Sequence, residues 1–226
     1  RRQKRGEALT LPIVLGAFLD ERAEQSGVTE NLGSCVDRPL LTGLRTDLYR
    51  CFMERTWRSM KTTGIVALIH PESHFTELRA NGLRRATYRR LRRHWQFRNE
   101  LSLFDIHHAK EYGVHVYGRD SEVRFKQGAA LYHPDTAARS FNHDGSGPAP
   151  GVKDDNGNWD TRPHAERIIE ITDSQLASWA DLIDETGTPP CEARMLYPIN
   201  TASAEVLDKI AASSRLRDID FDWTIG

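Results

Sequence analysis

The stretch Gly64-Ile-Val-Ala-Leu-Ile-His-Pro71 decides the predicted fold of this chain. Five apolar residues, Ile65–Ile69, follow one another without a polar residue at alternate positions. Such a run is typical of a strand buried on both faces, as in the centre of a parallel sheet covered by helices. Pro71 ends the strand, because proline cannot donate a hydrogen bond to the sheet. The run therefore predicts a central strand of an α/β fold.

Helical periodicity flanks this strand on both sides. We expect helices over residues 11–24 and 46–60 before it, separated by a loop over residues 27–41. After the strand, a helix is predicted from Phe75 or Leu78 to His94, because Leu83, Thr87 and Leu91 step by four.

Two further strands are predicted over residues 95–104 and 113–117. The spacer between them, residues 105–112, is too short for the crossover that a parallel pair requires. We therefore expect an antiparallel pair beside the central strand.

Four short segments follow one another in this order: Gly64–Pro71 with Phe75 after it, the arginine-containing LRRATYRRLRR, ELSLF ending in Phe104, and GVHVY. The series resembles the C-terminal half of class I S-adenosylmethionine-dependent DNA adenine-N6 methyltransferases of restriction-modification and phage-defence systems. The resemblance covers roughly residues 45–118. It implies an α/β fold with a partial Rossmann-like methyltransferase sheet, its late strands ending in an antiparallel hairpin, followed by a smaller α+β extension.

The resemblance also implies roles for particular residues. Phe104 stands where the family places an aromatic ring against the extruded adenine, and an aromatic face can replace the stacking that a flipped base loses. The turn after the predicted central strand lies at the sheet edge where α/β proteins bind ligands. The residues expected at this pocket edge are His70, Glu72, Ser73, His74 and Phe75. A simple turn, with Glu72 or Ser73 capping the next helix, is the alternative.

The family's catalytic tetrapeptide, Asn or Asp followed by Pro-Pro and an aromatic residue, is absent, since Pro189-Pro190 follows Thr188. The glycine-rich cofactor loop is absent as well. We therefore expect a fragment without catalytic residues, whose S-adenosylmethionine is used only by the full-length enzyme. Its expected partners are DNA and the remaining part of the same polypeptide or system. A non-enzymatic nucleic-acid-binding or assembly module is the alternative.

Residues 79–98 hold eight arginines and no acidic residue. A helix with this charge could lie along DNA phosphates, or it could be a solvated face whose arginine stems cover apolar surface. The residues expected to contact the DNA backbone are Arg84, Arg85, Arg89, Arg90, Arg92 and Arg93.

Charge divides the chain into a basic and an acidic part. Residues 1–150 carry 24 Lys and Arg against 17 Asp and Glu, and residues 151–226 carry 7 against 15. The break falls in a stretch rich in Gly, Pro, Asp and Asn. We accordingly expect a catalytic-domain half over residues 1–140, a loop over 141–160, and an acidic extension over 161–226, which begins a recognition or linking module.

Three scattered cysteines and the lack of a long apolar run predict a cytoplasmic protein without a membrane span. Nine histidines raise the question of a metal site. Pro71 argues against one helix presenting both His70 and His74, and no Cys or paired Asp completes a tetrahedral set. The sequence therefore predicts no metal site.

Overall fold

The computed structural model describes residues 10–214, which form two compact units divided between Arg58 and Ser59. The first unit contains α2 (Pro12–Leu32) and α3 (Leu48–Ser59). The helix predicted over residues 46–60 is confirmed by α3. The loop predicted over residues 27–41 is wrong at its start, because α2 continues through Gly27 to Leu32. None of the described helices combines the length and the apolar content needed to cross a bilayer.

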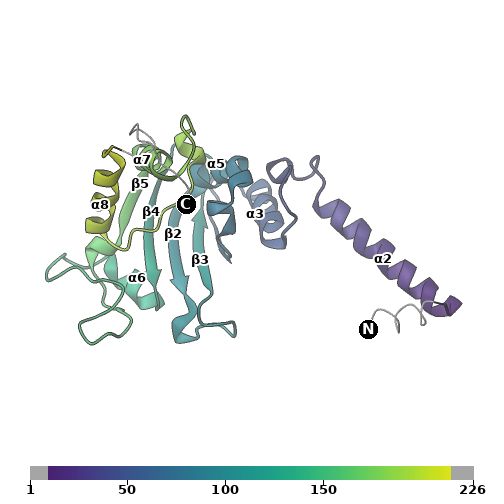
Figure 1. Ribbon diagram of the computed structural model, residues 1–226, viewed down its shortest axis with the longest axis horizontal. Helices are drawn as coiled ribbons and strands as arrows, with labels where there is room; N and C mark the ends of the chain where they lie inside the picture. Colours follow the sequence, from purple (N-terminus) through teal and green to yellow (C-terminus); the bar gives the residue numbers. More distant parts are fainter. Residues whose placement is uncertain (1–9, 215–226) are drawn as a thin grey trace, which may run out of the picture. The chain divides into compact units, whose positions relative to one another are not determined.

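The second unit is a mixed α/β structure built on one five-stranded sheet (Figure 1). Its elements are, in chain order, β1 (Val66–His70), α4 (Ser73–Thr76), α5 (Asn81–Arg90), β2 (Leu91–Arg98), β3 (Glu111–Tyr117), β4 (Arg124–Leu131), α6 (Pro134–Ser140), β5 (Ile169–Thr172), α7 (Asp173–Ile183) and α8 (Thr201–Ala211). The strands lie in the order β1-β3-β2-β4-β5. Only β2 and β4 form a parallel pair, and the other neighbours are antiparallel. The predicted α/β class is confirmed.

The antiparallel pairing of the two strands after the arginine-rich helix is also confirmed, with Trp95 opposite Val114 and His94 opposite His115. Their limits differ from the prediction. Strand β2 begins at Leu91 and ends at Arg98, so Arg92 and Arg93 lie on a strand and Phe104 lies in the following loop. His94, Trp95, Gln96 and Phe97 are all buried, as expected for a strand that is paired on both sides, here with β3 and β4, and covered on both faces.

Strand β1 lies at the edge of the sheet, which corrects the prediction of a central strand. Its residues alternate between intermediate and exposed until His70, which is buried. Ile65 and Ile69 are 71% and 58% exposed. Within the described residues β1 pairs only with β3, so its other edge carries no neighbouring strand.

The acidic part of the chain belongs to the same unit as the sheet. Strand β5 pairs with β4, and Gln127 of β4 donates a hydrogen bond to the carbonyl oxygen of Leu196. The compact units therefore divide the chain differently from the scheme based on charge. Residues 194–198 form no strand. Helix α8 begins with a capping box between Asn200 and Ser203.

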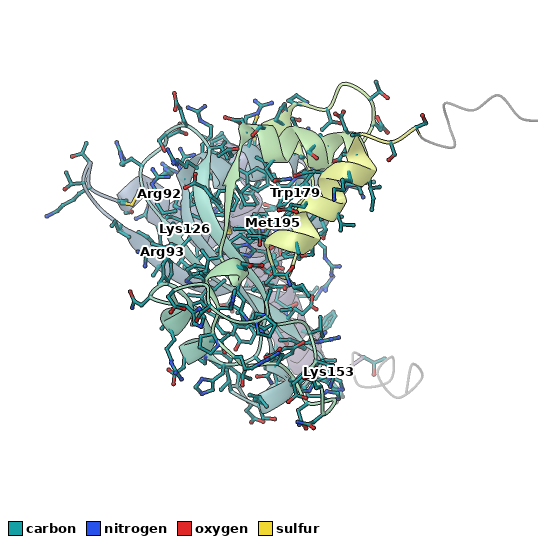
Figure 2. All side chains as sticks on the ribbon, turned by 90° about the vertical axis from the view of Figure 1, so that its left-hand side faces the viewer. Arg92, Arg93, Lys126, Lys153, Trp179 and Met195 are labelled. Atoms are coloured by element: carbon teal, nitrogen blue, oxygen red, sulfur yellow. The ribbon has the colours of Figure 1, made fainter. Side chains whose placement is uncertain are left out.

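Apolar side chains cover both faces of the sheet. On one face Tyr88 of α5 stacks on Phe125 of β4, and Trp179 of α7 is fully buried. The other face carries a cluster of Trp95, Phe97, Tyr112, Leu131 and Ala137, the last from α6. Figure 2 shows Arg93 and Lys126 on the side of the sheet opposite Trp179 and Met195. The α6 face therefore presents the exposed cations Arg93 and Lys126.

Candidate functional site

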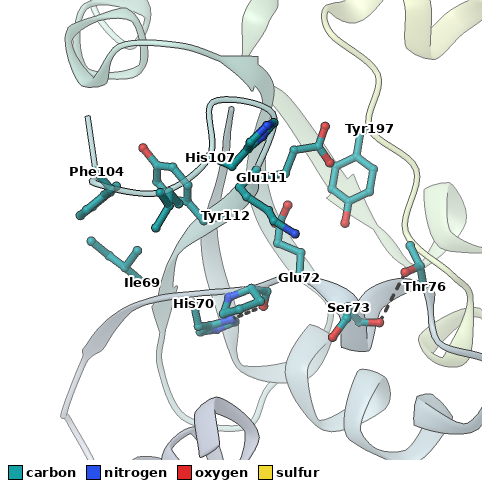
Figure 3. Close-up of a pocket in the computed structure, with 13 residues that line it drawn as sticks. Ile69, His70, Glu72, Ser73, Thr76, Phe104, His107, Glu111, Tyr112 and Tyr197 are labelled. Atoms are coloured by element: carbon teal, nitrogen blue, oxygen red, sulfur yellow. Dashed lines mark hydrogen bonds between the residues drawn. The ribbon is translucent and has the colours of Figure 1, made fainter. Parts of the chain in front are cut away.

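A pocket of about 920 Å³ opens where β1 ends (Figure 3). The end of β1 contributes His70 to its wall, and the turn and the first residue of α4 that follow contribute Glu72 and Ser73. The loop between β2 and β3 contributes Phe104. Three of the expected pocket-edge residues and the expected stacking residue thus line one pocket. His74 and Phe75 do not line it, because both side chains are fully buried.

Asn99 holds the loop that carries Phe104. Its fully buried side chain accepts a hydrogen bond from the Phe104 amide at 3.0 Å and donates to the carbonyl oxygens of Phe104 and Ile106. The Phe104 ring packs edge-on against Tyr112 with a centroid distance of 5.0 Å and remains 43% exposed. The backbone of the loop is therefore fixed while one ring face stays accessible. Sequence inspection did not identify Asn99 in this role.

Behind the pocket wall lies a buried group of histidines around Glu72. His94 and His115 face each other across β2 and β3, and His70 of β1 stacks on His115 at a ring distance of 3.9 Å. The Glu72 carboxylate is hydrogen-bonded to Nε2 of His94, and its Oε1 is 3.6 Å from Nε2 of His115. The sheet therefore gathers side chains that are far apart in the sequence.

Gly113 makes room for this group. A Cβ atom on Gly113 would lie 2.1 Å from Cε1 of His115 and 2.6 Å from Oε1 of Glu72. Both distances are far inside van der Waals contact, so a larger residue would displace the histidine or the carboxylate.

Burial and mutual attraction set the charges in the group. Burial alone would raise the pKa of Glu72, but the attraction of His94, the nearby ring nitrogen of His115 and the hydrogen bond to His94 lower it to about 2. Burial lowers the pKa of His70 to about 4 and that of His115 well below its ordinary value. At neutral pH the site thus holds an ionised carboxylate beside neutral imidazoles of His70 and His115.

Glu72, His94 and His115 offer one oxygen and two nitrogen ligand atoms that lie within 4.8 Å of one another. The sequence alone predicted no group of residues that could hold a metal ion. His94 was missed because it was placed in the arginine-rich helix. His115 lies on a correctly predicted strand, but its partner follows only from the register of β2 against β3.

The structure separates the six arginines expected at DNA. Arg84 is 2% exposed, and its guanidinium donates hydrogen bonds to the carbonyl oxygens of His74, Glu77 and Glu192. The expectation that Arg84 contacts phosphate is therefore corrected, since its donors hold the fold together.

Four of the others also have partners within the protein. Arg85 forms an ion pair with Glu192, and Arg89 and Arg90 both pair with Asp120. Arg92 donates to backbone carbonyl oxygens, including that of Arg119, and burial lowers its pKa.

Arg93 differs from these five residues. It is exposed, and within the described part of the chain no carboxylate pairs with it. Its guanidinium lies 4.9 Å from the ring centre of Phe141, and the amine of Lys126, its neighbour on β4, lies 5.1 Å from the same ring. Arg93 also lines a groove of about 810 Å³ that shares Ile69, Phe104 and Tyr112 with the pocket.

No protein-family model and no curated protein matches the sequence. Among solved structures, the crystal structure of the M protein of the type I restriction enzyme EcoKI aligns with 75% of this chain at 12% sequence identity, with a TM-score of 0.41. The chain spans 42% of the length of that protein. A likeness at this level establishes neither fold family nor function.

Proposed function

We propose that this chain forms the adenine-facing pocket wall of a DNA adenine-N6 methyltransferase of the restriction-modification or phage-defence type. The observation that carries the proposal is the meeting of the turn after β1 with Phe104 in one pocket. These are the two segments to which the resemblance gave a role in holding the target base. Phe104 presents an accessible ring, which is what an extruded base needs in place of its lost neighbours.

In this proposal DNA approaches across the α6 face of the sheet. Arg93 and Lys126 are exposed cations on that face, and the groove beside Arg93 leads to Phe104. Cations contact phosphates without reading sequence, so they would position the strand while the pocket receives the base. Of the six arginines expected at DNA, Arg93 keeps this role.

The resemblance implies that the cofactor binds at a glycine-rich turn after a strand. Within the described residues, the turns after β1 and β4 are Pro71-Glu72 and Tyr132-His133, without glycine. The proposed role is accordingly limited to the pocket wall and the DNA surface, and S-adenosylmethionine would be held by the rest of the enzyme.

Fluorescence of a single-stranded oligonucleotide carrying one 2-aminopurine, an adenine analogue, tests the pocket. Binding should quench the analogue, and Phe104→Ala should weaken binding by about 5- to 150-fold, the value of one stacked base. The control Phe52→Ala removes an exposed ring from α3 and should leave the affinity for the oligonucleotide unchanged. Equal affinity of Phe104→Ala and the unchanged chain would refute the proposal.

Salt dependence tests the DNA surface. Replacing Arg93 and Lys126 by Ser should reduce the slope of log K against log salt by about 1.4, since each contact to single-stranded phosphate contributes about 0.7. Arg89→Ser is the control, because Asp120 already holds that side chain. An unchanged slope in the double variant would remove this face from the DNA interface.

An assembly module is the second candidate function, and the edge position of β1 favours it. An open edge with exposed Ile65 and Ile69 can accept a strand from another chain or from another part of the same polypeptide. Sedimentation velocity distinguishes the candidates. Concentration-dependent association that Ile65→Lys abolishes, together with no binding of the oligonucleotide, would favour assembly.

A further inference from the structure

We propose that Glu72, His94 and His115 bind one divalent transition-metal ion at the inner wall of the pocket. The three residues come from the turn after β1, from β2 and from β3, so the sheet itself brings them together. The inference does not depend on the proposed role in DNA methylation.

The donor set matches the chemistry of such an ion. A carboxylate oxygen and two imidazole nitrogens are ligands of Zn²⁺ and of related first-row ions, with bond lengths of about 2.0–2.2 Å. Around a tetrahedral ion the ligand atoms stand about 3.4 Å apart, as these bond lengths require. The Glu72 and His115 atoms are already 3.6 Å apart, and all three ligand atoms lie within 4.8 Å of one another. The Glu72 and His94 atoms are hydrogen-bonded to each other, so an ion would have to replace that hydrogen bond and move the two atoms apart.

Hydrogen bonding within the group is incomplete. Within the described residues, Oε2 of Glu72, Nδ1 of His94 and both ring nitrogens of His115 are buried without a hydrogen-bond partner. Buried polar atoms without a partner are costly, and a bound cation would offer oxygen and nitrogen lone pairs a partner that the protein does not supply.

Access also fits an ion. The missing side chain of Gly113 lets the His115 ring and the Glu72 carboxylate come together beside the backbone of β3. The side chains of His94 and His115 are fully buried, whereas that of Glu72 is 8% exposed and lines the pocket. Three protein ligands with a remaining position toward a pocket are the usual arrangement of a zinc ion that keeps a water or substrate ligand. An ion would enter from the pocket past Glu72.

The competing explanation is a hydrogen-bonded triad in which Glu72 accepts from both histidines. Such a triad needs no metal, and it leaves the second nitrogen of each ring without a partner. Metal binding distinguishes the two explanations, because only the proposed site selects Zn²⁺ or Co²⁺ at one equivalent.

The test uses the full chain after treatment with a chelator. Titration with Co²⁺, followed by displacement with Zn²⁺, should show one saturable, chelator-reversible ion per chain, with a dissociation constant in the micromolar range or tighter. Glu72→Gln, His94→Gln and His115→Gln should each weaken binding by at least about 100-fold. The matched controls His108→Gln and Glu122→Gln change exposed residues outside the group and should bind like the unchanged chain.

A second measurement protects the test against variants that fail to fold. In the unchanged chain, Zn²⁺ should shift the NMR ring signals of His94 and His115 and leave those of His107 and His108 in place. The proposal is overturned if the folded chain binds neither ion, if folded variants of the three ligands bind as tightly as the unchanged chain, or if the shifts fall on the exposed histidines instead.

Discussion

Replacing Gly113 by alanine is a direct probe of the crowded group between β1, β3 and β2. The new Cβ would lie 2.1 Å from Cε1 of His115, whereas ordinary contacts begin near 3.4 Å. The imidazole would have to retreat by more than about 1 Å, and His70 stacked 3.9 Å away blocks that movement. We expect a loss of about 3 kcal/mol in the free energy of unfolding, at the upper end of overpacking costs.

For a chain of this size, such a loss corresponds to a fall of about 6–12 °C in Tm. Urea unfolding followed by circular dichroism, with a thermal scan beside it, measures both quantities. Gly82→Ala is the matched control, because nothing lies within 4 Å of its added Cβ in α5. It should stabilise the helix by about 0.5–1 kcal/mol.

The double variant Gly113→Ala, His115→Ala tests whether the clash with the His115 imidazole causes the loss of stability. Removal of the imidazole leaves space for the new methyl group, so the two substitutions together should cost clearly less than the sum of the single costs. Strict additivity, or a Gly113→Ala variant within 1 kcal/mol of the unchanged chain, would refute the reasoning.

Three more predictions concern residues away from Gly113. Arg84→Ala should destabilise the chain by at least about 3 kcal/mol in urea unfolding, because two buried hydrogen bonds and one part-buried hydrogen bond to carbonyl oxygens lose their donor. A small loss would mean that water replaces the guanidinium. The pKa of His70 is about 4 in the folded chain and about 6.5 in the unfolded chain. Between these pH values only the unfolded chain binds a proton at His70, so the free energy of unfolding should fall by up to about 3 kcal/mol as the pH drops from 6.5 to 4. Unfolding at several pH values should show a shallower fall for His70→Gln than for the control His108→Gln, and equal slopes would contradict the assignment. Asn200→Ala should lower the free energy of unfolding by about 1 kcal/mol, because α8 loses the capping box that Asn200 forms with Ser203. The loss would be measured as a lower Tm. An unchanged Tm would show that α8 does not contribute to the unfolding transition.

The sequence alone predicts an element and its pairing correctly where the local pattern agrees with the contacts in the folded chain. The short spacer after β2 requires an antiparallel partner, and β3 alternates clearly, so their pairing could be predicted. The same holds for α8, whose apolar positions repeat at helical spacing after Asn200.

The sequence alone does not predict the element correctly where tertiary contacts decide between helix and strand. The segment from Leu91 to Arg98 continues the helical spacing of Leu83 and Thr87, yet it forms β2 because β3 and β4 hydrogen-bond to both of its sides. Strand β4 was not predicted, since Arg, Lys and Gln interrupt its apolar residues. The position of β1 at the edge follows from the insertion of β3 beside it, which no local pattern encodes.

The candidate site was predictable only in part. The turn after β1 and Phe104 came from the ordered resemblance, and the pocket contains both. The Glu72 group required the register that sets His94 opposite His115, together with the missing side chain of Gly113. Likewise, which arginines are held in ion pairs depends on acidic residues distant in sequence, such as Asp120 and Glu192.

The pairing of β5 with β4 has a consequence for how the chain behaves when it is cut. Residues 144–148 are exposed and lie between α6 and β5, where a protease could act without touching the core. The two pieces would still share the β4–β5 ladder and the bonds from Gln127 to Leu196 and from Tyr88 to Ala193. The nicked molecule should therefore stay together until denatured, and separately expressed halves should reconstitute it.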